Sequence, residues 1–343
     1  MKVTNERKRL LKKFYVCLFF LIIGFMVVFC DGFVMGEVFL YQNIPGSKIG
    51  FSDRSVDVFN EDYEEIDVAG EDDVSFGTAE SSEPETDEIN LTALKDISEL
   101  RKKFYIVDKK TLMTADYFNV DKFLSADLKI KKNGDFPKVL IFHTHSHEMF
   151  ADSDQNDIYE GIVGAGARLK ERLEEKGIKC IHCTDRFDVV DGKVKIMGAY
   201  ERMEPAIRKI LSDNPSVEVV IDLHRDGIDE SKKLVTTVNG KPTAKFMFFN
   251  GLCRILEDGK LSETEGLSNP YVQDNLAFSF NLDLKTKQMY PSLSRGIYLN
   301  AYRYCLHMLP KSTLIELGAQ NNTKEEIFNA VDLLAEIIAE VID

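Results

Sequence analysis

The sequence is short of positive charge. It contains 43 lysine and arginine residues against 57 aspartate and glutamate residues, which gives a formal net charge of −14 at pH 7. Domains that bind nucleic acid normally carry a basic surface, because contacts with phosphate supply much of their affinity. The composition therefore argues against nucleic acid as a partner.

The sequence also lacks a disulfide framework, since its six cysteines are scattered along the chain. Cys180 and Cys183 have the spacing of half a zinc ribbon, but no second pair completes it. We expect these cysteines to be buried, unpaired thiols.

Several motifs of nucleotide-binding and metal-dependent enzymes are absent. No expected strand is followed by G-x-G-x-x-G or G-x-x-x-x-G-K-[ST], and no H-E-x-x-H occurs. The histidine cluster lacks the Asp-His ending of the metallo-β-lactamase motif H-x-H-x-D-H. An amidohydrolase barrel needs roughly 250 residues, and 207 residues remain from Pro137 to the end of the sequence.

An apolar segment near the N-terminus predicts a membrane anchor. Residues 14–30 carry no charge, follow a basic cluster and continue into an apolar stretch that ends at residue 35. We expect an anchor over 14–35 with the basic tail 1–13 in the cytosol and the remainder outside. The alternative is a cleaved signal peptide, which would normally have a shorter apolar region followed by a small-x-small site.

The next segment is strongly acidic. Between residues 51 and 90 the chain is crowded with Asp, Glu, Ser and Gly, and such a composition repels itself and buries little apolar surface. We expect residues 36–94 to form a flexible linker and residues 95–343 to form the folded domain. Within that domain, 95–134 reads as an N-terminal elaboration, helical in LTALKDISELRKKFYIV and without assignable chemistry, and 135–343 reads as the core.

The core sequence alternates between short apolar runs and amphipathic segments. Strands are expected at 138–143, 177–182, 217–224, 244–249, 295–300 and 313–318. Helices are expected at 159–177, 197–213, 269–288 and 323–343, the last with a capping box that starts at Thr323. This pattern predicts an α/β fold with a mostly parallel open sheet and helices on both faces.

Polar side chains follow three of the expected strands. His143, His145, His147 and Glu148 follow the first strand, and alternate residues of an extended segment point the same way, so the histidines could project together. His224, Arg225 and Asp226 close the middle strand, and Glu316 lies in the last one. Ligands of open α/β sheets bind beyond the carboxyl ends of the strands.

Imidazoles and carboxylates from separate strand ends are what a catalytic zinc site needs. Zinc held by three protein ligands leaves a place for water and lowers its pKa, and a further carboxylate can then take the proton. The inventory suits histidines and Glu148 from the first strand, His224 from the second, and Glu316 as the base. The histidines of the first strand cannot all bind the same ion, and His147 is the easiest to set aside.

Four motifs together resemble the stage II sporulation protein P family. They are KVLIFHTHSHE, VIDLHRDG, YPSLSRGIYLN and LPKSTLIELGAQNNTKEE, and the resemblance covers roughly residues 95–343. It implies a membrane-anchored, zinc-dependent cell-wall hydrolase related to N-acetylmuramoyl-L-alanine amidases, with a possible peptide cross-link endopeptidase activity. It also implies a role in forespore engulfment, in the mother-cell membrane facing the septal wall, alongside stage II sporulation proteins D and M.

The resemblance also implies roles for individual residues. His145 takes the position of the first zinc ligand, with His143 as the competing choice, and His224 is the second. Glu148 is preferred as the third ligand over Glu160, which lies nearer the helix position used by the related amidases. Glu316 is then the catalytic acid/base. Arg225 and Asp226 orient His224 or hold substrate.

Three functions remain to be separated. The first is a zinc amidase that acts on peptidoglycan outside the membrane. The second is a catalytically idle scaffold that keeps the zinc fold in order to bind the wall or a partner protein. The third is a metal-dependent hydrolase of a small molecule, for which a long tether has no evident use.

Overall fold

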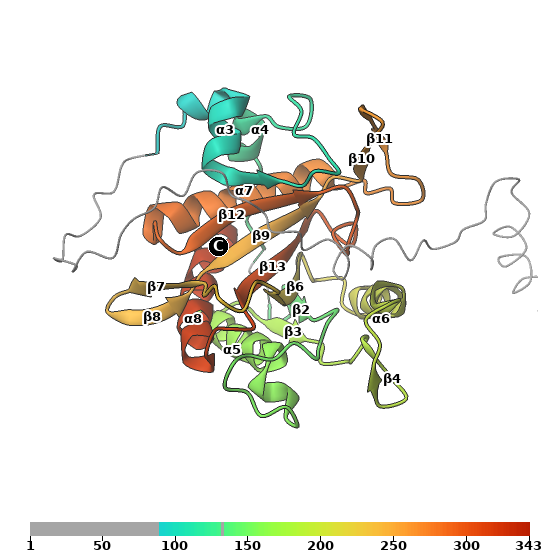
Figure 1. Cartoon of the computed structure of the whole chain (residues 1–343), viewed down its shortest axis with the longest axis vertical. Helices are drawn as coiled ribbons and strands as arrows, with labels where there is room; N and C mark the ends of the chain where they lie inside the picture. Colours follow the sequence, from blue (N-terminus) through green and yellow to red (C-terminus); the bar gives the residue numbers. More distant parts are fainter. Residues whose placement is uncertain (1–88, 132–133) are drawn as a thin grey trace, which may run out of the picture. The chain divides into compact units, whose positions relative to one another are not determined.

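A computed structural model describes residues 89–131 and 134–343 (Figure 1). The predicted basic tail 1–13 and anchor 14–35 lie outside the described residues, as does the predicted linker up to residue 88. No helix in the described part of the chain is both long enough and apolar enough to cross a membrane.

A seven-stranded sheet organises the domain, in the order β1-β12-β9-β13-β6-β2-β3. Its strands are β1 (Tyr105–Val107), β2 (Val139–Phe142), β3 (Cys180–His182), β6 (Val219–Asp226), β9 (Phe246–Gly251), β12 (Ser294–Asn300) and β13 (Lys311–Ala319). Every neighbouring pair is parallel except β9 and β13. The predicted α/β fold with a mostly parallel sheet is confirmed.

The antiparallel pair divides the sheet into two halves that run in opposite directions. β13, β6, β2 and β3 point one way, whereas β9, β12 and β1 point the other way. Leu317 near the end of β13 pairs with Phe246 at the start of β9, and Phe246 in turn pairs with Ser294 at the start of β12. The edge that receives the last residues of β6 and β13 therefore also receives the first residues of β9 and β12.

Helices cover both faces of the sheet, as expected, but unequally. The helices are η2 (Ala93–Lys95), α3 (Ile97–Phe104), α4 (Val120–Leu124), η3 (Ile158–Glu160), α5 (Ile162–Glu175), α6 (Ala199–Asp213), α7 (Val272–Met289) and α8 (Lys324–Ile342). One face packs against α5, α7 and α8, whose apolar side chains join a single buried cluster with those of the strands. On the other face a second cluster joins α6 to the segment 302–309 and to side chains of β2, β6, β9 and β13. Figure 1 shows α7 lying along β12 and β9, with α6 at the opposite end of the sheet.

The last helix begins where the sequence predicts. The hydroxyl of Thr323 accepts a hydrogen bond from the backbone N–H of Glu326, and the Glu326 carboxylate accepts one from the backbone N–H of Thr323. Both halves of the capping box are therefore present.

The sequence prediction was wrong at the end of the first helical stretch. The pattern of LTALKDISELRKKFYIV was taken as helical throughout, but residues 105–107 form β1, which pairs with β12 at the edge of the main sheet. Part of the expected N-terminal elaboration thus belongs to the core sheet. Three antiparallel hairpins were also not predicted, and their strands are β4 (Val189–Val190), β5 (Lys193–Val194), β7 (Val235–Val238), β8 (Lys241–Ala244), β10 (Arg254–Glu257) and β11 (Lys260–Glu263).

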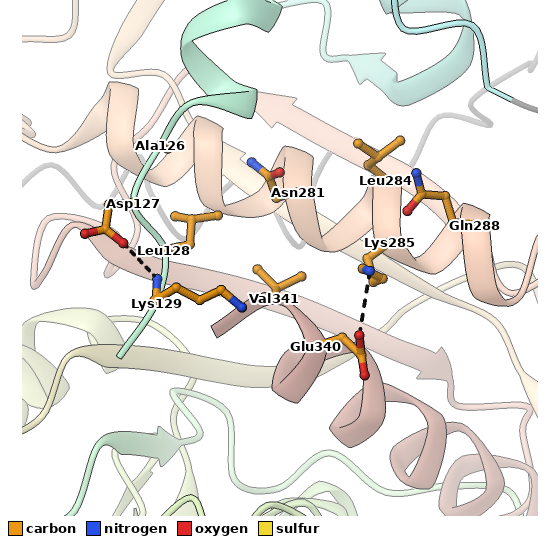
Figure 2. Close-up of a pocket in the computed structure, with 10 residues that line it drawn as sticks. All are labelled: Ala126, Asp127, Leu128, Lys129, Asn281, Leu284, Lys285, Gln288, Glu340 and Val341. Atoms are coloured by element: carbon orange, nitrogen blue, oxygen red, sulfur yellow. Dashed lines mark hydrogen bonds and ion pairs between the residues drawn. The ribbon is translucent and has the colours of Figure 1, made fainter. Parts of the chain in front are cut away.

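The face covered by α7 and α8 carries a pocket of about 330 Å³ (Figure 2). It lies between α7, the last turn of α8 and the segment 126–129, and an ion pair between Lys285 and Glu340 crosses it. None of the predicted site residues lines this pocket. The chemistry that the sequence suggests must therefore be sought elsewhere.

Candidate metal centre

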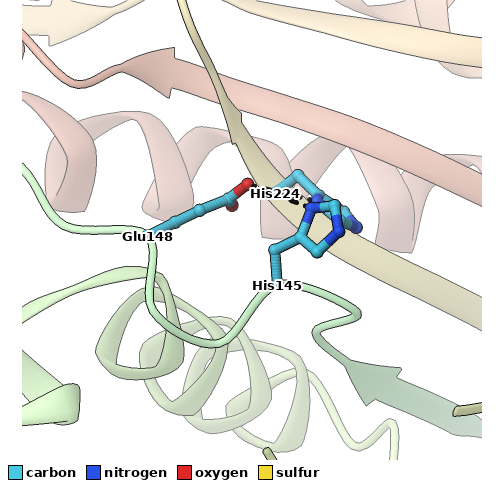
Figure 3. Close-up of side chains that lie close together, drawn as sticks. All are labelled: His145, Glu148 and His224. Atoms are coloured by element: carbon cyan, nitrogen blue, oxygen red, sulfur yellow. Dashed lines mark hydrogen bonds and ion pairs between the residues drawn. The ribbon is translucent and has the colours of Figure 1, made fainter. Parts of the chain in front are cut away.

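Three of the predicted ligands come together at the end of β6. His145, Glu148 and His224 each offer one ligand atom, and these atoms all lie within 4.8 Å of one another (Figure 3). Nδ1 of His145 and Nδ1 of His224 lie 3.7 Å and 3.4 Å from Oε1 of Glu148. All three side chains are buried. Two imidazoles and one carboxylate in this arrangement suit a zinc ion.

The three histidines after β2 do not project together as the extended pattern suggests. β2 ends at Phe142, and the chain then turns, so the two-residue period of a strand no longer applies. His143 continues the face of Val139 and Ile141, towards α5, where its ring lies beside that of His182. His145 instead reaches the α6 face, with its ring 5.9 Å from that of Tyr200.

His143 lies apart from the cluster, with both ring nitrogens engaged. Its Nδ1–H donates to the carbonyl of Leu223 at 2.8 Å, and its Nε2 lies 2.8 Å from Nε2 of His182. Burial lowers the pKa of His143 to about 4 and that of His182 to about 3. A Cβ added at Gly166 of α5 would lie 2.5 Å from Nε2 of His143, so glycine leaves the room that this pair occupies.

The two residues that the sequence analysis set aside have other contacts. His147 makes an ion pair with Asp188, which also accepts hydrogen bonds from the Ser146 hydroxyl at 2.6 Å and the His147 backbone N–H at 3.0 Å. Glu160 makes an ion pair with Lys324. Neither His147 nor Glu160 belongs to the group of possible ligands.

The charges around the cluster favour a cation. Although burial alone lowers the pKa of His224, the carboxylates of Asp222 and Glu148 raise it well above its ordinary value. Burial likewise opposes ionisation of Glu148, yet the His224 and His145 imidazoles hold the pKa of Glu148 far below its usual range. A buried site that stabilises positive charge between two carboxylates fits a divalent metal.

Asp222 is a neighbour of the metal centre that the sequence analysis missed. Its Oδ1 lies 2.8 Å from Nε2 of His224, on the side of the ring away from Glu148. Thr144 donates to the same carboxylate from its backbone N–H at 2.9 Å and from its hydroxyl at 2.7 Å. A carboxylate behind a metal-binding histidine fixes the ring and its tautomer. The signal was available, because Asp222 is a charged residue in an apolar strand, two positions before His224.

The Glu148 carboxylate is held by the backbone of the middle strand. The backbone N–H of Arg225 donates to Oε2 of Glu148 at 2.9 Å, which leaves Oε1 towards the histidines. The Arg225 side chain donates to the carbonyl of Met149 at 2.9 Å and so fixes the loop that carries Glu148. Arg225 therefore orients Glu148. The sequence analysis expected it to orient His224 or to hold substrate.

Glu316 lies beside the cluster on the neighbouring strand. In the register of β13 and β6 it is paired with His224. Burial and the nearby Asp226 carboxylate raise the pKa of Glu316 to about 8, and Oε2 of Glu316 is buried with no hydrogen-bond partner among the described residues. Asp226 makes an ion pair with Arg295 at 2.7 Å, a residue that the sequence analysis did not select.

The cysteines of the described residues conform to expectation. Cys180, Cys183, Cys253 and Cys305 are all free and buried. Burial raises the pKa of Cys180 to about 12 and that of Cys183 to about 11. Such thiols are poor metal ligands, because metals bind the thiolate.

Asp222→Asn is expected to weaken zinc binding about tenfold to a hundredfold, the range found when the partner of a metal-binding histidine is removed. Asparagine keeps the shape of the side chain but loses the charge that faces Nε2 of His224. Competition with a chromophoric chelator measures the affinity. Asp283→Asn is the matched control, because Asp283 is equally buried but contacts Ser294 and Lys287 on the α7 face. Equal affinities for wild type and Asp222→Asn would contradict the assignment.

Comparison with known proteins places the chain in a family. The family model of stage II sporulation protein P matches residues 46–339. The chain belongs to the stage II sporulation protein P family. The match begins within the predicted linker and includes every residue of the metal centre.

Stage II sporulation protein P of Bacillus subtilis is one relative of this family member. The two are 23% identical over 223 residues, which cover 61% of this chain and 52% of the relative. The matched region thus spans about half the length of that protein. The assignment to the family rests on the longer match of the family model.

Solved amidase structures show weaker likeness to this chain. The amidase AmiC2 of Nostoc punctiforme is 15% identical, with a TM-score of 0.35, over 62% of this chain and 96% of that one. The CwlD amidase of Clostridioides difficile, solved in complex with the GerS lipoprotein, is 16% identical, with a TM-score of 0.36, over 60% of this chain and 93% of that one. Likeness of this degree carries no functional argument.

Proposed function

We propose that the protein is a zinc-dependent hydrolase of peptidoglycan that cleaves the amide between the glycan and its stem peptide. The observation that carries the proposal is the buried set of His145, Glu148 and His224 with Glu316 paired to His224 on the next strand. Membership of the stage II sporulation protein P family supports the wall as the substrate and sporulation as the setting. Cleavage of peptide cross-links is a second activity that the same site could carry out.

The proposed ligands are His145, Glu148 and His224. A bound zinc ion supplies a Lewis acid that polarises a carbonyl oxygen and lowers the pKa of water. The Asp222 carboxylate faces Nε2 of His224, and the backbone N–H of Arg225 donates to Glu148, so groups behind both ligands support their positions.

Glu316 is the proposed proton-transfer residue. Its pKa of about 8 in the metal-free protein lies near the range in which a carboxyl both accepts and returns a proton. Ionisation of Glu316 is disfavoured by burial and by Asp226, and a positive charge at the neighbouring ligands would favour it. In the proposed reaction Oε2 of Glu316 accepts a proton from the attacking water and delivers it to the departing amine.

The membrane anchor and the partners remain proposals as well. A helix over 14–35 and a linker over 36–94 would hold the domain outside the membrane within reach of the wall. Stage II sporulation proteins D and M are the proposed partners at the septum. Labelling of the domain by an impermeant reagent on intact cells tests the orientation, and labelling only after lysis would contradict it.

Digestion of purified sacculi tests the proposed activity. The zinc-loaded protein is expected to release stem peptides with a free N-terminal alanine, identified by mass spectrometry, and chelation is expected to stop their release. One zinc per chain with no released product would instead support the catalytically idle scaffold. Hydrolysis of small amides with sacculi left intact would support the small-molecule hydrolase.

A further inference from the structure

A β-bulge lies at the start of β12. Ser294 pairs with Phe246 and Ile297 pairs with Phe248, so Arg295 and Gly296 together oppose a single residue, Met247. Bulges recur beside active sites, where they redirect a side chain. This one lies at the sheet edge where β6 and β13 end, because β12 runs in the reversed half of the sheet.

Glycine is required at the second position of the bulge. Gly296 has φ +96°, and a Cβ built there would lie 2.9 Å from the carbonyl oxygen of Phe104. Both the backbone conformation and the close approach of α3 therefore exclude a side chain. The sequence therefore encodes the bulge through Gly296.

The bulge directs Arg295 to the face that carries the metal centre. Ser294 contacts Asp283 of α7, and Ile297 packs in the cluster with α7 and α8, so the residues on either side of the bulge face the helices. Arg295 instead donates from Nη1 to Oδ2 of Asp226 at 2.7 Å. Asp226 follows His224 by two residues on β6 and so points to the same face.

The guanidinium of Arg295 has donors to spare. Its ion pair with Asp226 uses Nη1, whereas Nε and Nη2 make no hydrogen bond to any of the described residues. The side chain is 21% exposed, in contrast to the buried groups around it. Met247, which lies opposite the bulge on β9, pairs on its other side with Glu316 of β13, so Arg295 lies two strands from the proposed proton-transfer residue at the same level of the sheet.

We propose that Arg295 is a specificity-determining residue that binds a carboxylate of the substrate near the scissile amide. Arginine suits this role because its planar donors match a carboxylate and its charge is permanent. Asp226 fixes the guanidinium from one side and leaves the other donors for the ligand. The inference rests on the proposed function, since a stem peptide carries free carboxylates close to the amide that joins it to the glycan.

A pair of substrates that differ in one group tests the proposal. The probes are N-acetylmuramoyl-L-alanyl-D-isoglutamate and its D-isoglutamine counterpart, both with the γ-carboxyl blocked as a methylamide. They therefore differ only in a free α-carboxylate, which the second probe replaces with a carboxamide. For the zinc-loaded wild type, kcat/KM is expected to be roughly tenfold to a hundredfold higher for the carboxylate, the range set by one charged hydrogen bond. Arg295→Gln is expected to abolish this preference, so that the ratio of the two kcat/KM values falls to within about twofold of one. Arg295→Lys is expected to restore part of the preference.

Arg254→Gln is the matched control. Arg254 also makes one ion pair, at 3.1 Å to Asp116, and its side chain is 20% exposed. It lies on β10, away from the metal centre, and its substitution is expected to leave the preference intact. Equal losses for both substrates in Arg295→Gln, or a wild type with no preference, would overturn the proposal.

Binding measurements separate this proposal from the proposed function. Calorimetry with the zinc-loaded Glu316→Gln protein is expected to show tighter binding of the carboxylate probe, and no preference once Arg295→Gln is added. If wild type hydrolyses neither sacculi nor probes but binds the carboxylate probe more tightly through Arg295, the hydrolase is refuted and the carboxylate site stands. If the probes are hydrolysed at equal rates and bound equally, the hydrolase stands and the carboxylate site is refuted.

Discussion

Glu316→Gln is expected to lower kcat for release of stem peptides about a thousandfold, within the range that proton transfer by a positioned side chain contributes. Glutamine keeps the size of the side chain and cannot accept the proton. Zinc content and substrate affinity are expected to stay at the wild-type level, because Glu316 is not among the possible ligands. Release of stem peptides from sacculi measures the activity, and elemental analysis measures the zinc content. A variant that retains wild-type kcat would show that the proton is transferred elsewhere.

The same substitution is expected to stabilise the metal-free protein above pH 5. The pKa of Glu316 is about 8 in the folded chain against an ordinary value of 4.5, so between these values the folded state holds a proton that the unfolded state has released. Stability therefore falls as pH rises through this window, by about 1.4 kcal/mol per pH unit for this group. Glutamine has no such penalty.

Thermal unfolding at several pH values measures this effect. The Tm of Glu316→Gln is expected to exceed that of wild type at pH 8 and to match it near pH 4, where the carboxyl is protonated in both states. A gain of stability joined to a loss of activity is characteristic of residues kept for function. A Tm below that of wild type at pH 8 would contradict the assigned pKa shift.

His224→Asn is expected to lower zinc affinity roughly a hundredfold, because one ligand accounts for about a quarter of the binding free energy of a four-ligand site. His145→Asn is expected to do the same. Both substitutions remove a donor atom from the buried group of three. Isothermal titration or chelator competition gives the affinities, and stem-peptide release should fall with zinc occupancy.

His143→Asn serves as the matched control for this pair. It lies two residues before His145 and is equally buried, yet its ring nitrogens contact Leu223 and His182. An asparagine amide can still donate to the Leu223 carbonyl. Zinc affinity within about threefold of wild type is expected, as for a residue that does not bind the metal. A loss equal to that of His145→Asn would make His143 the ligand instead.

The sequence predicts most of the sheet because its strands are short apolar runs between amphipathic helices. β1 could not be found this way, since Phe104–Val107 continues the apolar pattern of α3 and gains its strand conformation from pairing with β12. The sequence pattern also could not decide whether His143 or His145 is the metal ligand. The choice depends on the turn after Phe142, which carries His145 to the opposite face of the sheet.

The residues that contact the metal centre and its loops also differ in whether the sequence could reveal them. Asp222 could have been predicted, because it lies two residues before His224 on the same strand and therefore on the same face. Asp188 and Arg295 could not, because their contacts with the loop after β2 and with Asp226 join segments that only the folded sheet brings together. The residue types of the site are thus visible in local sequence motifs, while its orientation and its proposed substrate contact depend on long-range register.

The order of the strands has a consequence for the time at which the site is completed. Among the described strands β13 comes last along the chain, but it lies at the centre of the sheet between β9 and β6, and it carries Glu316. A growing chain that has not reached Lys311 has neither a continuous sheet nor the proposed proton-transfer residue. The proposed hydrolase activity is therefore expected only of chains that include β13, however complete the preceding strands are.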